Sequence, residues 1–378
     1  MTIAYSGVDP STGRPVTVRL DGGHIVDVSA AEAPVDGWLA PGFVDLQVNG
    51  FAGLDVNGPE VSPEVVVELG RALAAAGTTS FAPTVITAAE DEMVASLRAI
   101  AAAREADQAT RDAIPFVHVE GPHLSPEEGA RGVHPVEHIR PPDFEEFLRW
   151  ERACGGLVGI VTLSPHYPGT ADYVRAVTQT GVRVSLGHTA ASPEQVTAAV
   201  DAGAVLSTHL GNGAAAMLPR HPNHLWTQLS EDRLTAGFIA DGHHLPSDAL
   251  TAMVRAKGIE RSLLVSDSVA LAGCEPGAYE TPVGGTVDLS ADGRLSYAGT
   301  PYLAGAARSL AEGVASAVGL ARIGLGDAVR MATANPGRFA GDRGVLRPGA
   351  RADLVLFDWA PGDSVLRLRS VVRSGRAV

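Results

Sequence analysis

GFVDLQVNG occupies residues 42–50, and its apolar first part predicts a buried β-strand. It is the first of eight short apolar runs that alternate with helical patterns along the middle of the chain. Several helical patterns begin at Ser, Thr or Asp and end at Gly, as helix boundaries do. Eight strand–helix units favour a closed (β/α)8 TIM barrel, with a doubly wound open sheet as the alternative. The runs lie at residues 42–48, 79–86, 114–120, 157–164, 182–188, 204–210, 235–241 and 262–267.

The two ends of the chain show a different pattern. Short β-like pieces occur within residues 1–40 and again within residues 345–378. Neither end has enough apolar surface for its own core, so we expect both to pair in one small β-sandwich domain. Residues 41–344 would then form the barrel, interrupted after its eighth strand by a short hairpin at residues 285–299.

Composition limits the classes of partner that the protein can have. The chain has 378 residues, 45% of them apolar, and a net charge of −14, which disfavours nucleic acid and anionic membranes as partners. No apolar run is long enough to span a bilayer, and the N-terminus has no signal-peptide pattern, so a cytoplasmic location is expected. Cys154 and Cys274 fit no metal or redox spacing and are expected to be ordinary thiols.

Ionisable residues end several of the predicted strands, where the active site of a barrel forms. Glu120, His188, His209 and Asp267 each close an apolar run. A single histidine of this kind could be a packed core residue, but four such groups at one barrel mouth are hard to explain by packing. One Glu and two His form the three-ligand set of a catalytic zinc site with an open position. Asp267 would accept a proton from the activated water, so the set indicates metal-assisted hydrolysis, with Zn2+ as the expected divalent metal.

Six stretches resemble motifs of one known group of proteins, the amidohydrolase superfamily. Within it, they are most similar to the N-acetylglucosamine-6-phosphate deacetylases, and the resemblance covers nearly the whole chain. The stretches are PGFVDLQVNG (41–50), HVEGPHL (118–124), GHTAAS (187–192), THLGNG (208–213), VSDSVALAG (265–273) and AVRMATANPGRFAG (328–341).

The resemblance implies roles for individual residues. Glu120, His188 and His209 fall on the metal ligands of the family, and Asp267 falls on its catalytic aspartate. His134 falls where a histidine contacts the sugar and acyl portions of the substrate.

Three further residues correspond to substrate-binding positions. The family motif HLxNAM keeps its asparagine here as Asn212, but the loop that follows is rewritten as GAAAMLPRHPNHLW. Arg220 and His244 fall near phosphate-binding positions, which a neighbouring subunit supplies in part, so a homodimer is expected. The rewritten loop leaves open whether Arg220 binds phosphate or only pins the loop.

Gln47 and Asn49 stand where many amidohydrolases carry His-x-His for a second metal. An amide oxygen is a poor substitute for imidazole on a transition metal, so these residues replace a second metal site and one divalent metal per chain is expected. Binuclear relatives often bridge their metals with a carboxylated lysine, but the only lysine, Lys257, lies in a helical pattern.

The leading functional hypothesis is deacetylation of N-acetylglucosamine 6-phosphate to glucosamine 6-phosphate and acetate. The second is deacylation of another N-acyl amino sugar or of an N-acyl amino acid. A catalytically inactive binding protein is the third, and metal content would distinguish it. His118 could support Glu120 or pack in the barrel, whereas His123, His138, His166 and His221 are expected to be ordinary loop or surface residues.

Overall fold

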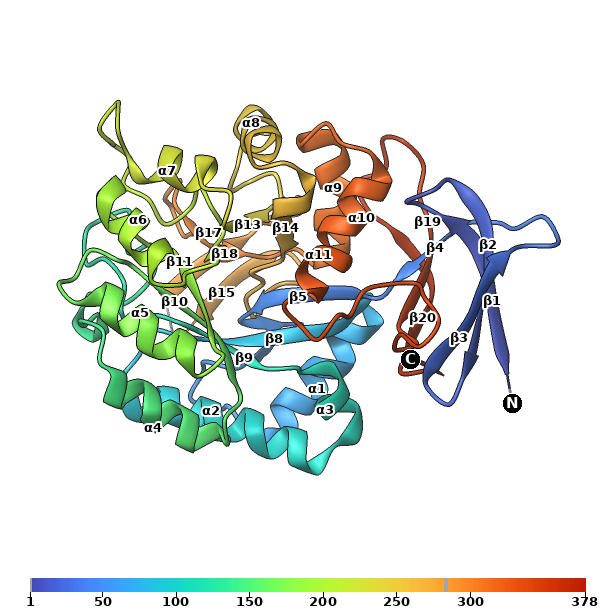
Figure 1. Cartoon of the computed structure of the whole chain (residues 1–378), viewed down its shortest axis with the longest axis horizontal. Helices are drawn as coiled ribbons and strands as arrows, with labels where there is room; N and C mark the ends of the chain where they lie inside the picture. Colours follow the sequence, from blue (N-terminus) through green and yellow to red (C-terminus); the bar gives the residue numbers. More distant parts are fainter. Residues whose placement is uncertain (1, 282–284) are drawn as a thin grey trace.

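A ring of eight parallel strands forms the centre of the computed structural model, which describes residues 2–281 and 285–378 (Figure 1). Neighbouring strands in the sheet are also consecutive in the barrel sequence, and helices surround them. The predicted TIM barrel is therefore confirmed. The strands are β5 (Phe43–Val48), β8 (Thr78–Ile86), β9 (Val117–Glu120), β10 (Val158–Leu163), β11 (Arg183–Leu186), β12 (Leu206–Ser207), β13 (Thr235–Ile239) and β14 (Ser262–Val265).

Backbone hydrogen bonds between the segment that follows β14 and the end of β5 close the ring, which excludes the open-sheet alternative. The amide of Asp267 donates to the carbonyl of Gln47 at 3.0 Å, and the amide of Asn49 donates to that of Ser268 at 2.8 Å. The buried carboxylate of Asp45 also accepts the amide hydrogen of Ser266 at 3.2 Å. Closure thus brings the ends of the first and eighth strands together.

The predicted helices all form, with small differences at their ends. Asp143 and Ser192 cap two of them by accepting hydrogen bonds from the amides of Glu145 and Gln195, as the sequence suggested. The helices around the barrel are α1 (Pro63–Ala75), α2 (Glu90–Ala106), α3 (Gln108–Ala113), α4 (Phe144–Cys154), α5 (Thr170–Gln179), α6 (Pro193–Asp201), α7 (His224–Ser230), α8 (Ser247–Lys257), α9 (Leu310–Leu320), α10 (Leu325–Met331) and α11 (Ala334–Gly337), with short 3-10 turns η1 (Val136–His138) and η2 (Ile259–Arg261).

The two ends of the chain share one seven-stranded sheet beside the barrel (Figure 1). Val18 and Leu20 from the N-terminal strands pack against Leu354 and Val372 from the C-terminal strands, so both ends contribute to one sandwich-like core. Its strands are β1 (Ile3–Asp9), β2 (Arg14–Asp21), β3 (His24–Ala30), β4 (Trp38–Pro41), β19 (Leu354–Asp358), β20 (Arg367–Arg373) and β21 (Arg376–Ala377).

The insertion after the eighth barrel strand is larger than the predicted hairpin. It forms a four-stranded antiparallel sheet of β15 (Gly277–Thr281), β16 (Gly285–Leu289), β17 (Arg294–Tyr297) and β18 (Leu303–Ala306). Val287 and Leu295 of this sheet pack with Leu271, which follows β14. A small two-stranded sheet, β6 (Gly50–Phe51) and β7 (Leu54–Asp55), lies beyond the end of β5. In the part of the chain that the structure describes, no helix is both long enough and apolar enough to cross a membrane.

Candidate active site

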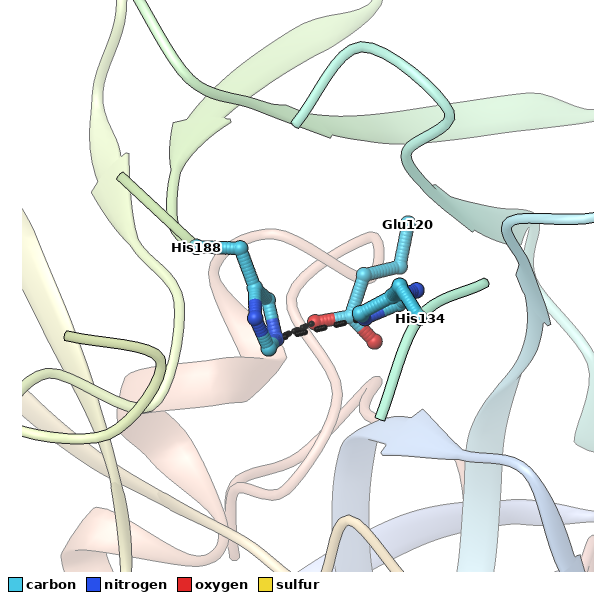
Figure 2. Close-up of side chains that lie close together, drawn as sticks. All are labelled: Glu120, His134 and His188. Carbon is cyan, nitrogen blue, oxygen red and sulfur yellow. Dashed lines mark hydrogen bonds and ion pairs between the residues drawn. The ribbon is translucent and has the colours of Figure 1, made fainter. Parts of the chain in front are cut away.

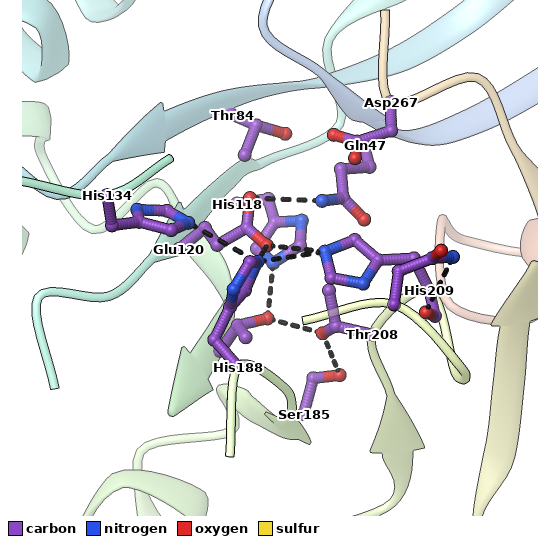
Figure 3. A network of polar contacts seen from close by, with 12 residues as sticks. Gln47, Thr84, His118, Glu120, His134, Ser185, His188, Thr208, His209 and Asp267 are labelled. Atoms are coloured by element: carbon purple, nitrogen blue, oxygen red, sulfur yellow. Dashed lines mark hydrogen bonds and ion pairs between the residues drawn. The ribbon is translucent and has the colours of Figure 1, made fainter. Parts of the chain in front are cut away.

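Glu120, His188 and His209 converge at the carboxyl ends of β9, β11 and β12 (Figure 3). Glu120 Oε1 lies 3.3 Å from His188 Nε2 and 3.0 Å from His209 Nε2, and the two Nε2 atoms are 3.1 Å apart. Ligands of a tetrahedral zinc ion, bonded at about 2.0–2.1 Å, are roughly 3.3–3.4 Å from one another. The spacing of these three atoms therefore fits a shared small cation.

The protonation of the two histidines also favours a cation at this point. His188 Nδ1 lies 2.9 Å from the carbonyl oxygen of Ala130, which can only accept, so Nδ1 carries a hydrogen and Nε2 is the ring atom that would bind a cation. Burial lowers the pKa of His209, but the carboxylate of Glu120 outweighs this effect and raises it to about 8. Without a metal the cluster holds a proton, and metal binding would displace it.

His134 joins the cluster from the loop after β9 (Figure 2). Glu120, His134 and His188 each present a ligand atom within 4.8 Å of the others, and all three are buried. His134 Nε2 lies 3.3 Å from His188 Nε2. Burial first, and His188 next, lower the pKa of His134 to about 3, so its imidazole is neutral.

Asp267 lies at the same mouth, after β14. Burial raises the pKa of its carboxyl group to about 6, and the negative charge of Glu120 contributes. Its Oδ1 accepts a hydrogen bond of 2.9 Å from Asn49 Nδ2. A carboxylate whose pKa lies close to neutrality is suited to accepting and returning a proton.

The two amides of the first strand each donate to a carboxylate of the site. Gln47 Nε2 donates to Glu120 Oε2 at 3.0 Å, while Asn49 holds Asp267. Glu120 therefore has one oxygen fixed by Gln47 and the other turned towards the histidines. The amides orient both acidic groups, a role that their place in the sequence did not reveal.

Backbone conformation marks the same strand ends. His188, His209 and Asp267 have φ values of 46°, 26° and 51°, in the left-handed region that residues other than glycine avoid. Such strain costs about 1–3 kcal/mol per residue and persists where the surrounding structure enforces it, often at functional sites.

A cavity of about 840 Å³ opens above these groups. His244 lines it, with Nδ1 held 2.6 Å from Asp241 Oδ2, and so does Asn212, whose Nδ2 donates to the carbonyl of His209 at 3.2 Å. Val287 and Leu295 of the inserted sheet form part of the wall. Among the described residues that line the cavity there is no arginine or lysine.

Arg220 lies away from this cavity, on the exposed loop between β12 and α7. In the described part of the chain, its guanidinium has no hydrogen-bond or ion-pair partner. Met217 and Trp226, near it in the sequence, are 87% and 55% exposed. The structure thus places Arg220 on the surface, on a loop that also carries exposed apolar side chains, and not in the pocket of its own chain.

The Amidohydrolase family matches residues 38–378 of the chain. The chain belongs to the amidohydrolase family. A relative from Shewanella sp. (strain ANA-3), N-acetylgalactosamine-6-phosphate deacetylase, is 34% identical and covers 85% of this chain and 79% of its own length. The N-acetylglucosamine-6-phosphate deacetylase of Bos taurus is also 34% identical, with 90% of this chain and 83% of the relative covered. The crystal structure of N-acetyl-D-glucosamine-6-phosphate deacetylase from Mycobacterium smegmatis has a TM-score of 0.87, is 28% identical and covers 100% of both chains.

This amidohydrolase keeps its only lysine away from the metal cluster. Lys257 is buried at the end of α8, where its Nζ donates to the carbonyls of Gln228 at 2.8 Å and Glu231 at 2.5 Å. It stabilises the end of α7. The lysine bridge of binuclear relatives therefore has no counterpart at these strand ends.

Several residues that shape the site carried no recognisable signal in the sequence. Gly132 and Gly213, both with positive φ, pack against the ring of His188, where an added Cβ would come within 3.0 Å and 2.7 Å of it. Ala130 fixes the same ring through its carbonyl group. A glycine permits the backbone to approach another group closely, but the sequence does not show which group that is.

Two other histidines belong to the framework. His118 is bonded to the carbonyl of Leu46 and to Thr162 at 2.7 Å, so it forms part of a polar layer inside the barrel (Figure 3). His123 lies in a loop, as expected, and is fully buried there between Trp150 and Tyr173.

Proposed function

We propose that this amidohydrolase is a metal-dependent amide hydrolase that deacetylates N-acetylglucosamine 6-phosphate to glucosamine 6-phosphate and acetate. The convergence of Glu120, His188 and His209 beside Asp267 is the observation that carries the proposal. The similarity to deacetylases of amino sugar 6-phosphates along nearly the whole chain supports it.

One divalent metal, with Zn2+ the preferred ion, would be held by Glu120, His188 and His209. When bound, it supplies a Lewis acid that makes water nucleophilic near neutral pH. Gln47 holds the Glu120 carboxylate in its ligand orientation. The amides of Gln47 and Asn49 leave no strong ligands for a second ion, which supports one metal per chain.

Asp267 moves the proton in the proposed reaction. Its carboxylate, oriented by Asn49, takes a proton from the attacking water and delivers it to the leaving nitrogen. His134 contacts the acyl oxygen of the substrate from the opposite loop, and Asn212 and His244 contact the sugar and its phosphate. Glu120 and His134 are buried at the edge of the cavity, and burial strengthens the polar contacts that they make.

The sugar itself has two candidates. The Shewanella relative is named for N-acetylgalactosamine 6-phosphate, whereas the bovine relative is named for the glucosamine isomer. Acetate release should be compared for both 6-phosphates, for N-acetylmannosamine 6-phosphate and for unphosphorylated N-acetylglucosamine. If the protein turned over only unphosphorylated sugars or N-acyl amino acids, the second hypothesis would be correct and the proposed substrate wrong.

The phosphate group would be bound best by an arginine or lysine, and the described lining residues of the pocket include neither. Asp55, Glu60 and Glu280 line the cavity, so an anionic substrate would be repelled without a placed positive charge. We infer that Arg220 of a second subunit enters the pocket, in a homodimer that covers Met217 and Trp226. Because a phosphate ester crosses membranes poorly, the cytoplasm is the proposed location.

Arg220→Ala is expected to raise KM for the 6-phosphate sugar by roughly 10–150-fold. This corresponds to about 1.5–3 kcal/mol, the contribution of a hydrogen bond to a charged group. The unphosphorylated sugar should lose little, because the guanidinium grips only phosphate oxygens. Steady-state kinetics on both sugars measure the difference, with Arg14→Ala, an exposed arginine of the terminal sheet, as the control.

Mixed dimers test the shared site directly. A subunit with Arg220→Ala and one with Asp267→Asn are each impaired as homodimers, but together they assemble one complete site. Recovered activity in the mixture would support the proposal. If Arg220→Ala lowered activity equally on both sugars, and mixing did not restore activity, Arg220 would have only a structural role in its loop.

A further inference from the structure

The loop after β9 surrounds His188 and touches both of its nitrogens. Ala130 accepts a hydrogen bond from Nδ1 at 2.9 Å, and His134 Nε2 lies 3.3 Å from Nε2. Gly132, between them, packs against the same ring. His134 is 3% exposed, so the loop delivers its imidazole into the buried cluster (Figure 2).

With His188 neutral, as a metal ligand must be, the contact between the two imidazoles has two chemical interpretations. Because Nδ1 of His188 carries the hydrogen, its Nε2 has one lone pair to offer. Either His134 donates a hydrogen to that lone pair, or both lone pairs face a common cation. A metal on His188 uses the lone pair and thereby excludes the first arrangement. In the metal-loaded protein, His134 Nε2 must then turn its own lone pair towards the ion or move away.

The position of His134 favours ligation. Its Nε2, His188 Nε2 and a Glu120 oxygen lie within 4.8 Å of one another, which makes this trio a possible metal-binding group by itself. Glu120 ends a barrel strand, and His188 and His209 lie just beyond two others, whereas His134 comes from a loop. A ligand on a loop is easier to displace than one held at a strand end.

We propose that His134 is a fourth protein ligand of the metal in the substrate-free protein. It closes the position that three strand-end ligands leave open, and it is released to the acyl oxygen when substrate enters. The inference rests on the metal site of the proposed function and adds a resting state to it.

Cobalt substitution tests the inference, because the visible spectrum of Co2+ depends on the number and geometry of its ligands. The measurement compares wild type, His134→Ala and His138→Ala, the last being a histidine of the same loop outside the cluster. We expect His134→Ala alone to change the spectrum and to speed metal loss to a chelator by roughly tenfold or more, since even indirect partners of ligands contribute 10–100-fold to affinity. Added imidazole should restore the wild-type spectrum.

Substrate provides the second part of the test. In the Asp267→Asn background, N-acetylglucosamine 6-phosphate should shift the cobalt spectrum when His134 is present and leave it nearly unchanged in Asp267→Asn/His134→Ala. Identical spectra and chelation rates for wild type, His134→Ala and His138→Ala would overturn the inference while leaving the metal site intact. A wild-type protein that binds no Co2+ or Zn2+ would instead overturn the proposed function.

Discussion

Replacing Asp267 with asparagine is expected to lower kcat for acetate release by roughly 10²–10⁴-fold, the usual contribution of a positioned general acid–base group. Asparagine has nearly the same size and also tolerates the left-handed backbone found at this position, where φ is 51°. The substitution therefore removes the proton acceptor with little change of shape. Metal content should stay close to that of wild type, because Asp267 is not among the proposed ligands.

Asp342→Asn is a matched control for this experiment. Asp342 also has a positive φ, 57°, but it is exposed on the surface away from the cavity. Its substitution should leave kcat unchanged. A near-wild-type rate for Asp267→Asn would assign the proton transfer to another group, and loss of metal in that variant would show that Asp267 contributes to metal binding.

Glu120→Gln is expected to lower activity as strongly as Asp267→Asn does, but by weakening metal binding. Glu120 is the negatively charged member of the proposed ligand set and touches both histidines through one oxygen. A neutral amide is a much weaker metal ligand, so metal affinity should fall by at least about 100-fold. Activity at low zinc should fall to background.

Thermal stability gives an independent measurement for Glu120→Gln. At a zinc concentration of about 100 Kd, binding stabilises the wild-type fold by roughly 2.7 kcal/mol, and the variant should lose this gain. Glu146→Gln is the control, because Glu146 is also a buried carboxylate, bonded to Arg140 at 3.1 Å on α4. That variant should be less stable but keep its response to zinc. A full zinc response in Glu120→Gln would remove Glu120 from the ligand set.

The sequence was sufficient to predict the barrel and to identify the ionisable residues that lie at its mouth. Parallel barrel strands are buried on both faces, so each appears as an apolar run, and a charged residue at the end of one is conspicuous. The pairing of both chain ends in one sheet also followed from their short β-like pieces.

Contacts between distant segments were beyond the reach of sequence patterns. Nothing local indicates that Ala130, Gly132 and Gly213 enclose His188, because each lies in a loop whose course depends on the whole fold. Trp150 and Tyr173 from two helices bury the loop residue His123, and nothing in the neighbouring sequence indicates this contact. The inserted sheet was underestimated because the predicted hairpin covered only residues 285–299, whereas β15 and β18 add a strand on each side of it.

A zinc titration of the metal-free protein, followed by acetate release from N-acetylglucosamine 6-phosphate, tests the central claim most directly. We expect no activity in the metal-free protein and a linear rise that ends at about one equivalent of zinc per chain. Activity that continues to rise to about two equivalents, as in two-metal hydrolases, would contradict the single-metal account. Full activity in the metal-free protein would contradict metal-dependent deacetylation altogether.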